Sequence, residues 1–114
     1  MEDINDVLKD NAKEYYKNAL GAEKKGEFNT AVTLFFKTIS SLADLYILLK
    51  ESRMPKSHTD RFRILEDKYP EIYKLIDKNF PFYQDSYRAK LNKEICEVLR
   101  EDAEKLFREL KIQF

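Results

Sequence analysis

Residues that break helices are scarce in this chain, and this limits its possible folds more than any other feature. The 114 residues include two glycines and three prolines. No stretch alternates apolar and polar residues as a half-buried strand would, and apolar residues instead recur every three or four positions. We therefore predict an all-α fold, an antiparallel up-and-down bundle of four to five helices, with residues 1–114 forming a single domain.

The helix breakers divide the first half of the chain into two predicted helices. Residues 3–25 carry one apolar stripe, with Asp3 as N-cap and Gly26 at the left-handed position after the last turn. The link that follows is short, so the next helix, from 29 or 30 to 51, must fold back antiparallel. Pro55 cannot continue that helix, which predicts a loop over 52–57.

The second half is predicted to hold shorter helices and one long one. Ser57-His-Thr-Asp60 has the pattern of a capping box, with Ser57 as N-cap, and opens a third helix that ends before Pro70. We expect a fourth helix over 70–79 and an aromatic turn at Phe80–Tyr83. The last helix begins between Gln84 and Tyr87, is strongly amphipathic, and pairs with the central helix.

The predicted helix up to residue 51 is apolar around most of its circumference, so it should be the central helix. A narrow polar strip along it consists of Thr30, Thr33, Lys37, Ser40, Ser41 and Asp44. We interpret this strip as a solvated edge, or as a place where small side chains let another helix approach. A functional role for Asp44 is the alternative.

Charge is balanced over the whole chain but not along it. The 21 basic and 21 acidic residues argue against a dedicated nucleic-acid module. Between residues 50 and 63, however, only Glu51 and Asp60 oppose the basic residues Lys50, Arg53, Lys56, Arg61 and Arg63. This separation predicts an anionic partner or ligand, or self-association through complementary faces, with a merely solvated face as the alternative.

The only histidine, His58, follows Arg53 with four residues between them. Such a pair can cleave RNA without a metal, because imidazole moves a proton while guanidinium holds the phosphate. In the first turn of a helix the dipole disfavours imidazolium, so we expect a mostly neutral His58, beside N–H groups that can bind a phosphate. Catalysis by Arg53 and His58 is one hypothesis, and a solvated loop histidine is the other.

A group of tyrosines with an arginine follows Pro81. Tyr83, Tyr87 and Arg88 at a helix start can stack on a base and hold a phosphate. Tyrosines at a helix–helix seam are the commoner arrangement. The candidate contacts to an anion or nucleotide are Lys56, His58, Arg61, Arg63, Tyr83, Tyr87 and Arg88.

The single cysteine, Cys96, cannot form an intrachain disulfide, which fits a reducing cytoplasm. No second cysteine or histidine lies near it, so the sequence predicts no metal site and no cofactor.

The segment MEDINDVLKD lacks the apolar core of a signal peptide, and the run LADLYILL is too short to span a bilayer. We therefore expect a cytoplasmic protein without a membrane segment.

The order of these features resembles the HEPN domain family, helical bundles found in prokaryotic toxin–antitoxin operons beside minimal nucleotidyltransferases. The resemblance covers the chain from about Asn11 and rests on the hairpin around KKGEFNTAV, on Pro55, Ser57 and His58, on Tyr83, Tyr87 and Arg88, and on Glu101, Asp102, Ala103 and Glu104. It implies a bundle of four or five helices, often dimeric, with an RNA- or nucleotide-linked function.

The chain departs from the catalytic members of that family. These members carry an Arg-x4–6-His motif at the start of a late helix, whereas here no histidine follows Arg88 and the Arg53-x4-His58 pair lies in the proline loop. The departure favours a non-catalytic homodimer that partners a nucleotidyltransferase-type protein, RNA or nucleotide. A metal-independent ribonuclease is the second hypothesis.

A third hypothesis is an interaction protein without chemistry. The pattern Ala19-x6-Gly26-x-Phe28-x2-Ala31-x3-Phe35 resembles the first helical pair of a tetratricopeptide repeat. No second unit follows at a fixed period, as a solenoid would require.

Overall fold

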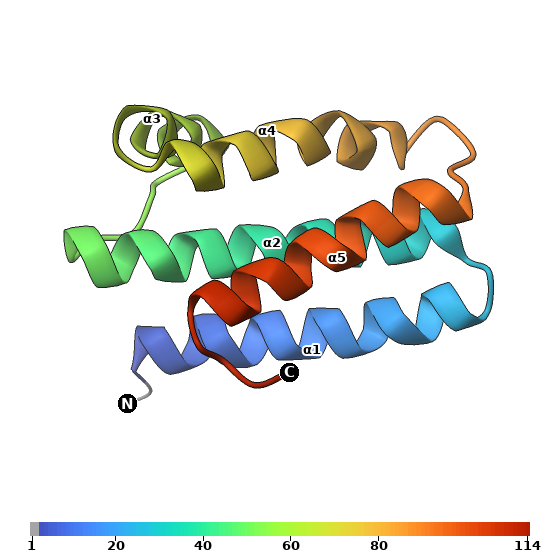
Figure 1. Cartoon of the computed structure of the whole chain (residues 1–114), viewed down its shortest axis with the longest axis horizontal. Helices are drawn as coiled ribbons and strands as arrows, with labels where there is room; N and C mark the ends of the chain where they lie inside the picture. The colour runs from blue at the N-terminus through green and yellow to red at the C-terminus, as the bar shows by residue number, and fades with distance from the viewer. Residues whose placement is uncertain (1–2) are drawn as a thin grey trace.

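The computed structural model describes residues 3–114, which contain five α-helices and no strand (Figure 1). Helices α1 (Ile4–Lys24), α2 (Phe28–Glu51), α4 (Pro70–Asp85) and α5 (Lys93–Glu109) run alternately up and down. Helix α3 (His58–Lys68) lies across one end of the bundle and is seen nearly end-on in Figure 1. The predicted all-α antiparallel bundle is confirmed.

The hairpin of α1 and α2 follows the local sequence signals. The Asp3 carboxylate accepts a hydrogen bond from the Asn5 N–H at 2.8 Å and caps α1. Gly26 has φ of 75°, the left-handed conformation that costs glycine least. Both assignments were predicted, and they explain why α1 ends where it does and why α2 folds back against it.

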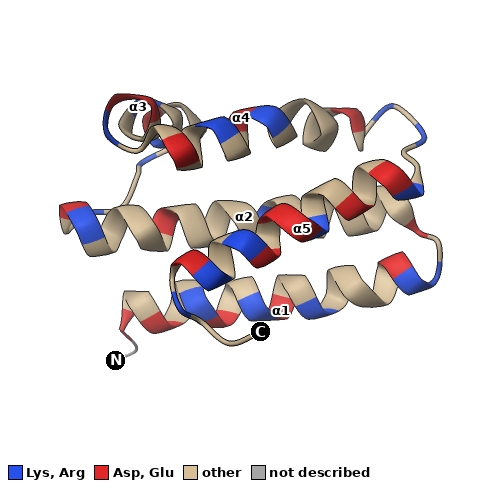
Figure 2. Ribbon diagram, viewed as in Figure 1, with Lys and Arg blue, Asp and Glu red and all other residues tan. Residues whose placement is uncertain are grey.

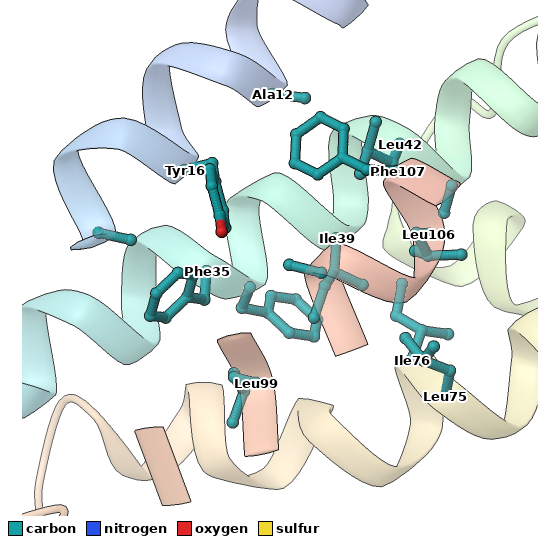
Figure 3. Close-up of a cluster of buried hydrophobic side chains, with 14 of the residues drawn as sticks. Ala12, Tyr16, Phe35, Ile39, Leu42, Leu75, Ile76, Leu99, Leu106 and Phe107 are labelled. Carbon is teal, nitrogen blue, oxygen red and sulfur yellow. The ribbon is translucent and has the colours of Figure 1, made fainter. Parts of the chain in front are cut away.

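Helix α2 is the centre of the bundle, because it contacts each of the other four helices. Phe35, Phe36 and Ile39 are at most 1% exposed, and Figure 3 shows α2 residues between side chains of α1, α4 and α5. Burying each such side chain contributes about 1.5–3 kcal/mol. By length and composition alone, α2 is the one helix in residues 3–114 that could cross a membrane, and a buried core helix meets the same criterion.

The predicted boundaries of the last two helices were wrong. α4 does not turn at Phe80–Tyr83 but continues to Asp85, with Pro81 inside it. Proline inside a helix costs about 3 kcal/mol. Packing offsets this cost, since the rings of Phe80 and Tyr83 lie with their centroids 5.8 and 4.6 Å from that of Phe36.

Helix α5 starts later than expected, at Lys93, with the Asn92 side chain capping the Ile95 N–H at 2.9 Å. Tyr87 and Arg88 therefore lie in the turn between α4 and α5, not in a helix. The sequence predicts an earlier start because the apolar spacing from Tyr87 to Leu91 continues that of the helix. The predicted pairing of the amphipathic α5 with α2 is confirmed.

One residue of α2 holds that turn in place. The Asn29 amide donates to the carbonyl oxygens of Ser86 at 3.0 Å and Ala89 at 2.6 Å, and its carbonyl oxygen accepts from the Leu91 N–H at 3.0 Å. Three hydrogen bonds from one side chain satisfy backbone groups that lie outside any helix. The geometry of the turn therefore depends on Asn29.

We expect Asn29→Ala to lower the free energy of unfolding by about 1–3 kcal/mol, because three hydrogen bonds are lost together. Urea denaturation monitored by circular dichroism measures the change. Asn18→Ala is the matched control, since the Asn18 amide bonds only to the Glu14 carbonyl of its own helix. Equal losses for the two variants would contradict the role assigned to Asn29.

Candidate functional site

A buried ion pair joins α2 to α3. Arg61 Nε lies 2.6 Å from Asp44 Oδ1, and Arg61 Nη2 lies 2.8 Å from Asp44 Oδ2, a bidentate arrangement. The two residues are only 9% and 8% exposed. The polar strip of α2 is thus not a solvated edge at Asp44 but the place where α3 approaches, and Arg61 points inward to it.

His58 contacts the same ion pair. Its Nδ1 lies 2.6 Å from Arg61 Nη1 in a partly buried contact. Since guanidinium has only donors, Nδ1 must accept, which makes the imidazole neutral with its proton on Nε2. Burial, and then the Arg61 charge, lower the pKa of His58, in line with the neutral form predicted from the sequence.

The structure does not bring Arg53 and His58 together as a catalytic pair. Within residues 3–114, Arg53 pairs with Asp60 at 3.2 Å instead, and its side chain is 51% exposed. His58 has its Nδ1 lone pair committed to Arg61 and a proton on Nε2, so neither nitrogen is free to accept a proton.

The first turn of α3 is capped largely as predicted. Ser57 Oγ accepts from the Asp60 N–H at 3.1 Å. The Asp60 carboxylate accepts in turn from the N–H of Lys56, one residue before the position that a capping box uses, at 2.9 Å. This bond, followed by the contact with Arg53, lowers the pKa of Asp60. The loop is therefore tied to the helix it precedes.

Two cations beside the cap of α3, one in the preceding loop and one in the middle of the helix, remain directed to solvent. Lys56 and Arg63 are exposed, and neither forms an ion pair within the described residues. They border a shallow, open groove of about 470 Å³ together with Arg53, Ser57 and Asp60. Figure 2 shows basic residues on the link between α2 and α3. Three cations and one carboxylate give this groove a positive character.

The predicted aromatic group is divided between core and surface. Tyr83 stacks on Phe36, with an interplanar angle of 18°, and so belongs to the packing. Tyr87 is 74% exposed, and its hydroxyl lies 3.1 Å from that of Tyr83. Arg88 is exposed and lies 3.6 Å from Asp85. Of the two tyrosines, Tyr87 has the ring that is more accessible to a ligand.

Other parts of the molecule offer less chemistry. Cys96 is fully buried, and burial raises the pKa of its thiol to about 12, so it is an unreactive core residue. No group of three or more His, Cys, Asp or Glu side chains in residues 3–114 is arranged to hold a metal ion. The groove between α2, α4 and α5, about 410 Å³, has an apolar floor including Tyr46, Ile72 and Leu75 and contains none of the predicted site residues.

We expect Asp44→Ala to lower the free energy of unfolding by about 3–5 kcal/mol, because Arg61 would be left buried without its partner. The double variant Asp44→Leu/Arg61→Leu should recover most of this loss, since it removes both charges. Urea denaturation provides the measurement, and Arg53→Ala serves as the exposed-pair control. A loss no larger than that of the control would show that the pair is not energetically important.

We also expect the protein to lose stability as the pH falls below about 6.5, the unperturbed pKa of histidine. The pKa of folded His58 is lowered, so between its folded and unfolded pKa values the unfolded chain binds more protons. The stabilisation is fully present above the unfolded pKa and is lost as the pH falls through the folded one. Lys37 and Arg61 oppose protonation, and Asp44 favours it.

Urea midpoints at neutral and mildly acidic pH test this expectation, with His58→Gln as the control. The drop in midpoint should be smaller in the variant, because the remaining drop comes from carboxylates. An imidazole proton resonance that titrates at or above the unperturbed pKa would contradict the assignment.

The geometry thus combines a buried ion pair, a neutral histidine held against it, and two exposed cations, Lys56 before α3 and Arg63 in its middle. This arrangement is suited to holding an anion and poorly suited to proton transfer. A comparison of the chain with protein-family models, with curated proteins and with solved structures finds no match in any of the three.

Proposed function

We propose that this chain is a HEPN-like helical protein that binds phosphate-bearing ligands, RNA or nucleotide, without cleaving them. The observation that carries the proposal is that neighbouring cations around α3 differ in whether they have an ion-pair partner. Arg61 is committed to Asp44 in the interior, whereas Lys56 and Arg63 are exposed and form no ion pair within residues 3–114. Cations without an internal partner are available to an external anion.

Two further features favour a phosphate in the groove. The pair of Arg53 and Asp60 is exposed at the arginine, and such surface pairs contribute about 0–1 kcal/mol, so Arg53 can turn to a phosphate oxygen at little cost. The groove also lies at the N-terminal end of α3, where the helix dipole favours negative charge. Both effects add to the charge of Lys56 and Arg63.

The state of His58 supports binding over cleavage. With Nδ1 accepting from Arg61, the Nε2–H can donate a hydrogen bond but cannot take the proton of an attacking hydroxyl. His58 does not line the groove, so its role is that of a neutral residue held against Arg61 and not that of a base. The ribonuclease that uses Arg53 and His58 is the less favoured hypothesis for the same reason.

The resemblance to HEPN domains extends the proposal to a cellular setting. On this basis the chain functions in the cytoplasm, in a toxin–antitoxin-like or stress system, with a nucleotidyltransferase-type protein as a further partner. The helical scaffold without chemistry is what remains if no phosphate-bearing ligand binds.

Fluorescence anisotropy with a short labelled single-stranded RNA tests the proposal. We expect salt-dependent binding by the wild type, and binding weakened about tenfold or more in Lys56→Glu/Arg63→Glu. The slope of log K against log salt should become shallower by roughly 1.4, because each phosphate contact contributes about 0.7 for single strands. The same double variant should lose affinity for a labelled nucleotide if nucleotide is the ligand.

The matched control is Lys24→Glu/Lys105→Glu, which makes the same change in net charge at exposed lysines away from the groove. Equal weakening in both double variants would show that the groove is not the site, and absence of binding by the wild type would remove the proposal. Incubation of RNA with the wild type in chelator should leave it intact. Cleavage that His58→Ala abolishes would establish the ribonuclease instead.

A further inference from the structure

The segment after α5 turns back and forms one wall of a groove on α1. Lys111 has φ of 58° and reverses the chain, and the Ile112 N–H donates to the Phe107 carbonyl oxygen at 2.9 Å. The reversal brings the ring of Phe114 onto that of Phe107, with the centroids 5.0 Å apart. Figure 1 shows the segment crossing over α1. The segment is therefore packed against the bundle by its aromatic residue.

One face of α1 forms the other wall and the floor of this groove. The groove has a volume of about 440 Å³ and is lined by Lys13, Tyr16, Lys17, Leu20, Gln113 and Phe114. The four lining residues from α1 follow one another at steps of three, one and three, so they share one face of the helix. Sites for small molecules have volumes of about 300–1,000 Å³, so the groove is large enough to hold one.

The apolar part of the groove is largely aromatic. The rings of Tyr16 and Phe114 meet edge to face, with centroids 5.5 Å apart and an interplanar angle of 81°. The Tyr16 hydroxyl donates to the Glu104 carboxylate at 2.5 Å and so is already satisfied within the protein. Phe114 is 50% exposed, although it has aromatic neighbours on the bundle. Its ring is therefore available to pack against a flat apolar ligand.

The charged residues that line the groove are both lysines. Lys13 and Lys17 are exposed, lie one helical turn apart, and form no ion pair within residues 3–114. Asp10 and Glu14 each precede one of these lysines by three residues but do not line the groove. The Arg108 guanidinium lies 5.8 Å from the centroid of the Phe114 ring and adds a third cation nearby. The groove thus combines an aromatic surface with positive charge.

We propose that this groove binds a singly charged organic acid with an aromatic body. The carboxylate of the ligand lies between the ammonium groups of Lys13 and Lys17, and the Gln113 amide supplies a further donor. The ring of the ligand packs against Phe114 and Leu20. Like charges four residues apart destabilise a helix, so a carboxylate between the two lysines also relieves their repulsion.

The shape of the groove sets the strength and the independence of this binding. The groove is shallow and open, so it covers less of a ligand than an enclosed pocket does, and the affinity is low. Ion pairs at exposed lysines are screened, so the affinity falls as the salt concentration rises. The groove shares no lining residue with the phosphate groove at α3, so either site can fail without the other.

Titration of the full chain with naphthoate at neutral pH and low salt, followed by amide NMR spectra, tests the proposal. Naphthoate carries one carboxylate on an aromatic body, and naphthamide and naphthylmethylammonium keep the body but are neutral and cationic. We expect naphthoate to shift the amide signals of residues 13–20 and 113–114. Naphthamide should bind more weakly, and naphthylmethylammonium should not bind in the groove, because the lysines repel it.

Two variants separate the contributions of charge and ring. Lys13→Gln/Lys17→Gln should weaken naphthoate binding about tenfold, because two exposed ion pairs of up to about 1 kcal/mol each are lost. Phe114→Ala should weaken binding of naphthoate and naphthamide alike, since it removes the ring that both contact. Lys24→Gln/Lys25→Gln is the matched control, because it neutralises two exposed lysines at the far end of α1.

The NMR spectra also verify that each variant is folded. Naphthoate binding that the control leaves unchanged and the other two variants weaken supports the proposal. It is overturned if naphthoate shifts no signal in the groove, if naphthylmethylammonium binds there equally well, or if the control weakens binding as much as Lys13→Gln/Lys17→Gln. Signals that shift only around α3 overturn it as well, and they leave the phosphate proposal intact.

Discussion

The ion pair between Asp44 and Arg61 determines how the two halves of this molecule are joined at the end of the bundle where α3 lies. Helix α3 is short and crosses the end of the bundle, where it buries Ile64 and Leu65 in the core. The bidentate pair of Arg61 with Asp44 adds a directional contact to this packing and so sets the rotation of α3 about its axis. That rotation places His58 against Arg61 and leaves Lys56 and Arg63 facing solvent.

Within a few residues of α3, one arginine holds the fold together and another is exposed to solvent, where it can contact a ligand. Arg61 and Arg63 are two positions apart on the same helix, yet one is buried in a pair and the other is exposed. The buried pair makes His58 a neutral donor, so the same contact that holds α3 also argues against proton transfer at this site. A binding surface follows more directly from this geometry than an active site.

Local chemistry made the hairpin and the cap of α3 predictable, because Asp3, Gly26 and Ser57 act on their own neighbours. The predictions at Pro81 and Tyr87 were wrong, because Phe80 and Tyr83 pack on Phe36 and keep the helix intact around Pro81, and because Tyr87 lies in a turn held by Asn29. Both causes are contacts between residues far apart in the chain. The partner of Asp44 was likewise not predictable, although an acid in so apolar a helix was a signal that it needed one.

The Asn29 side chain also bears on the order in which the chain can assemble. Its bonds reach residues 57 to 62 positions later, whereas α1 and α2 are joined by a short link and pack extensively on each other. During synthesis the hairpin can form first, because its contacts close a small loop. Asn29 is then already in place to form its hydrogen bonds with the turn before α5. The last helix therefore packs onto a hairpin that has already folded.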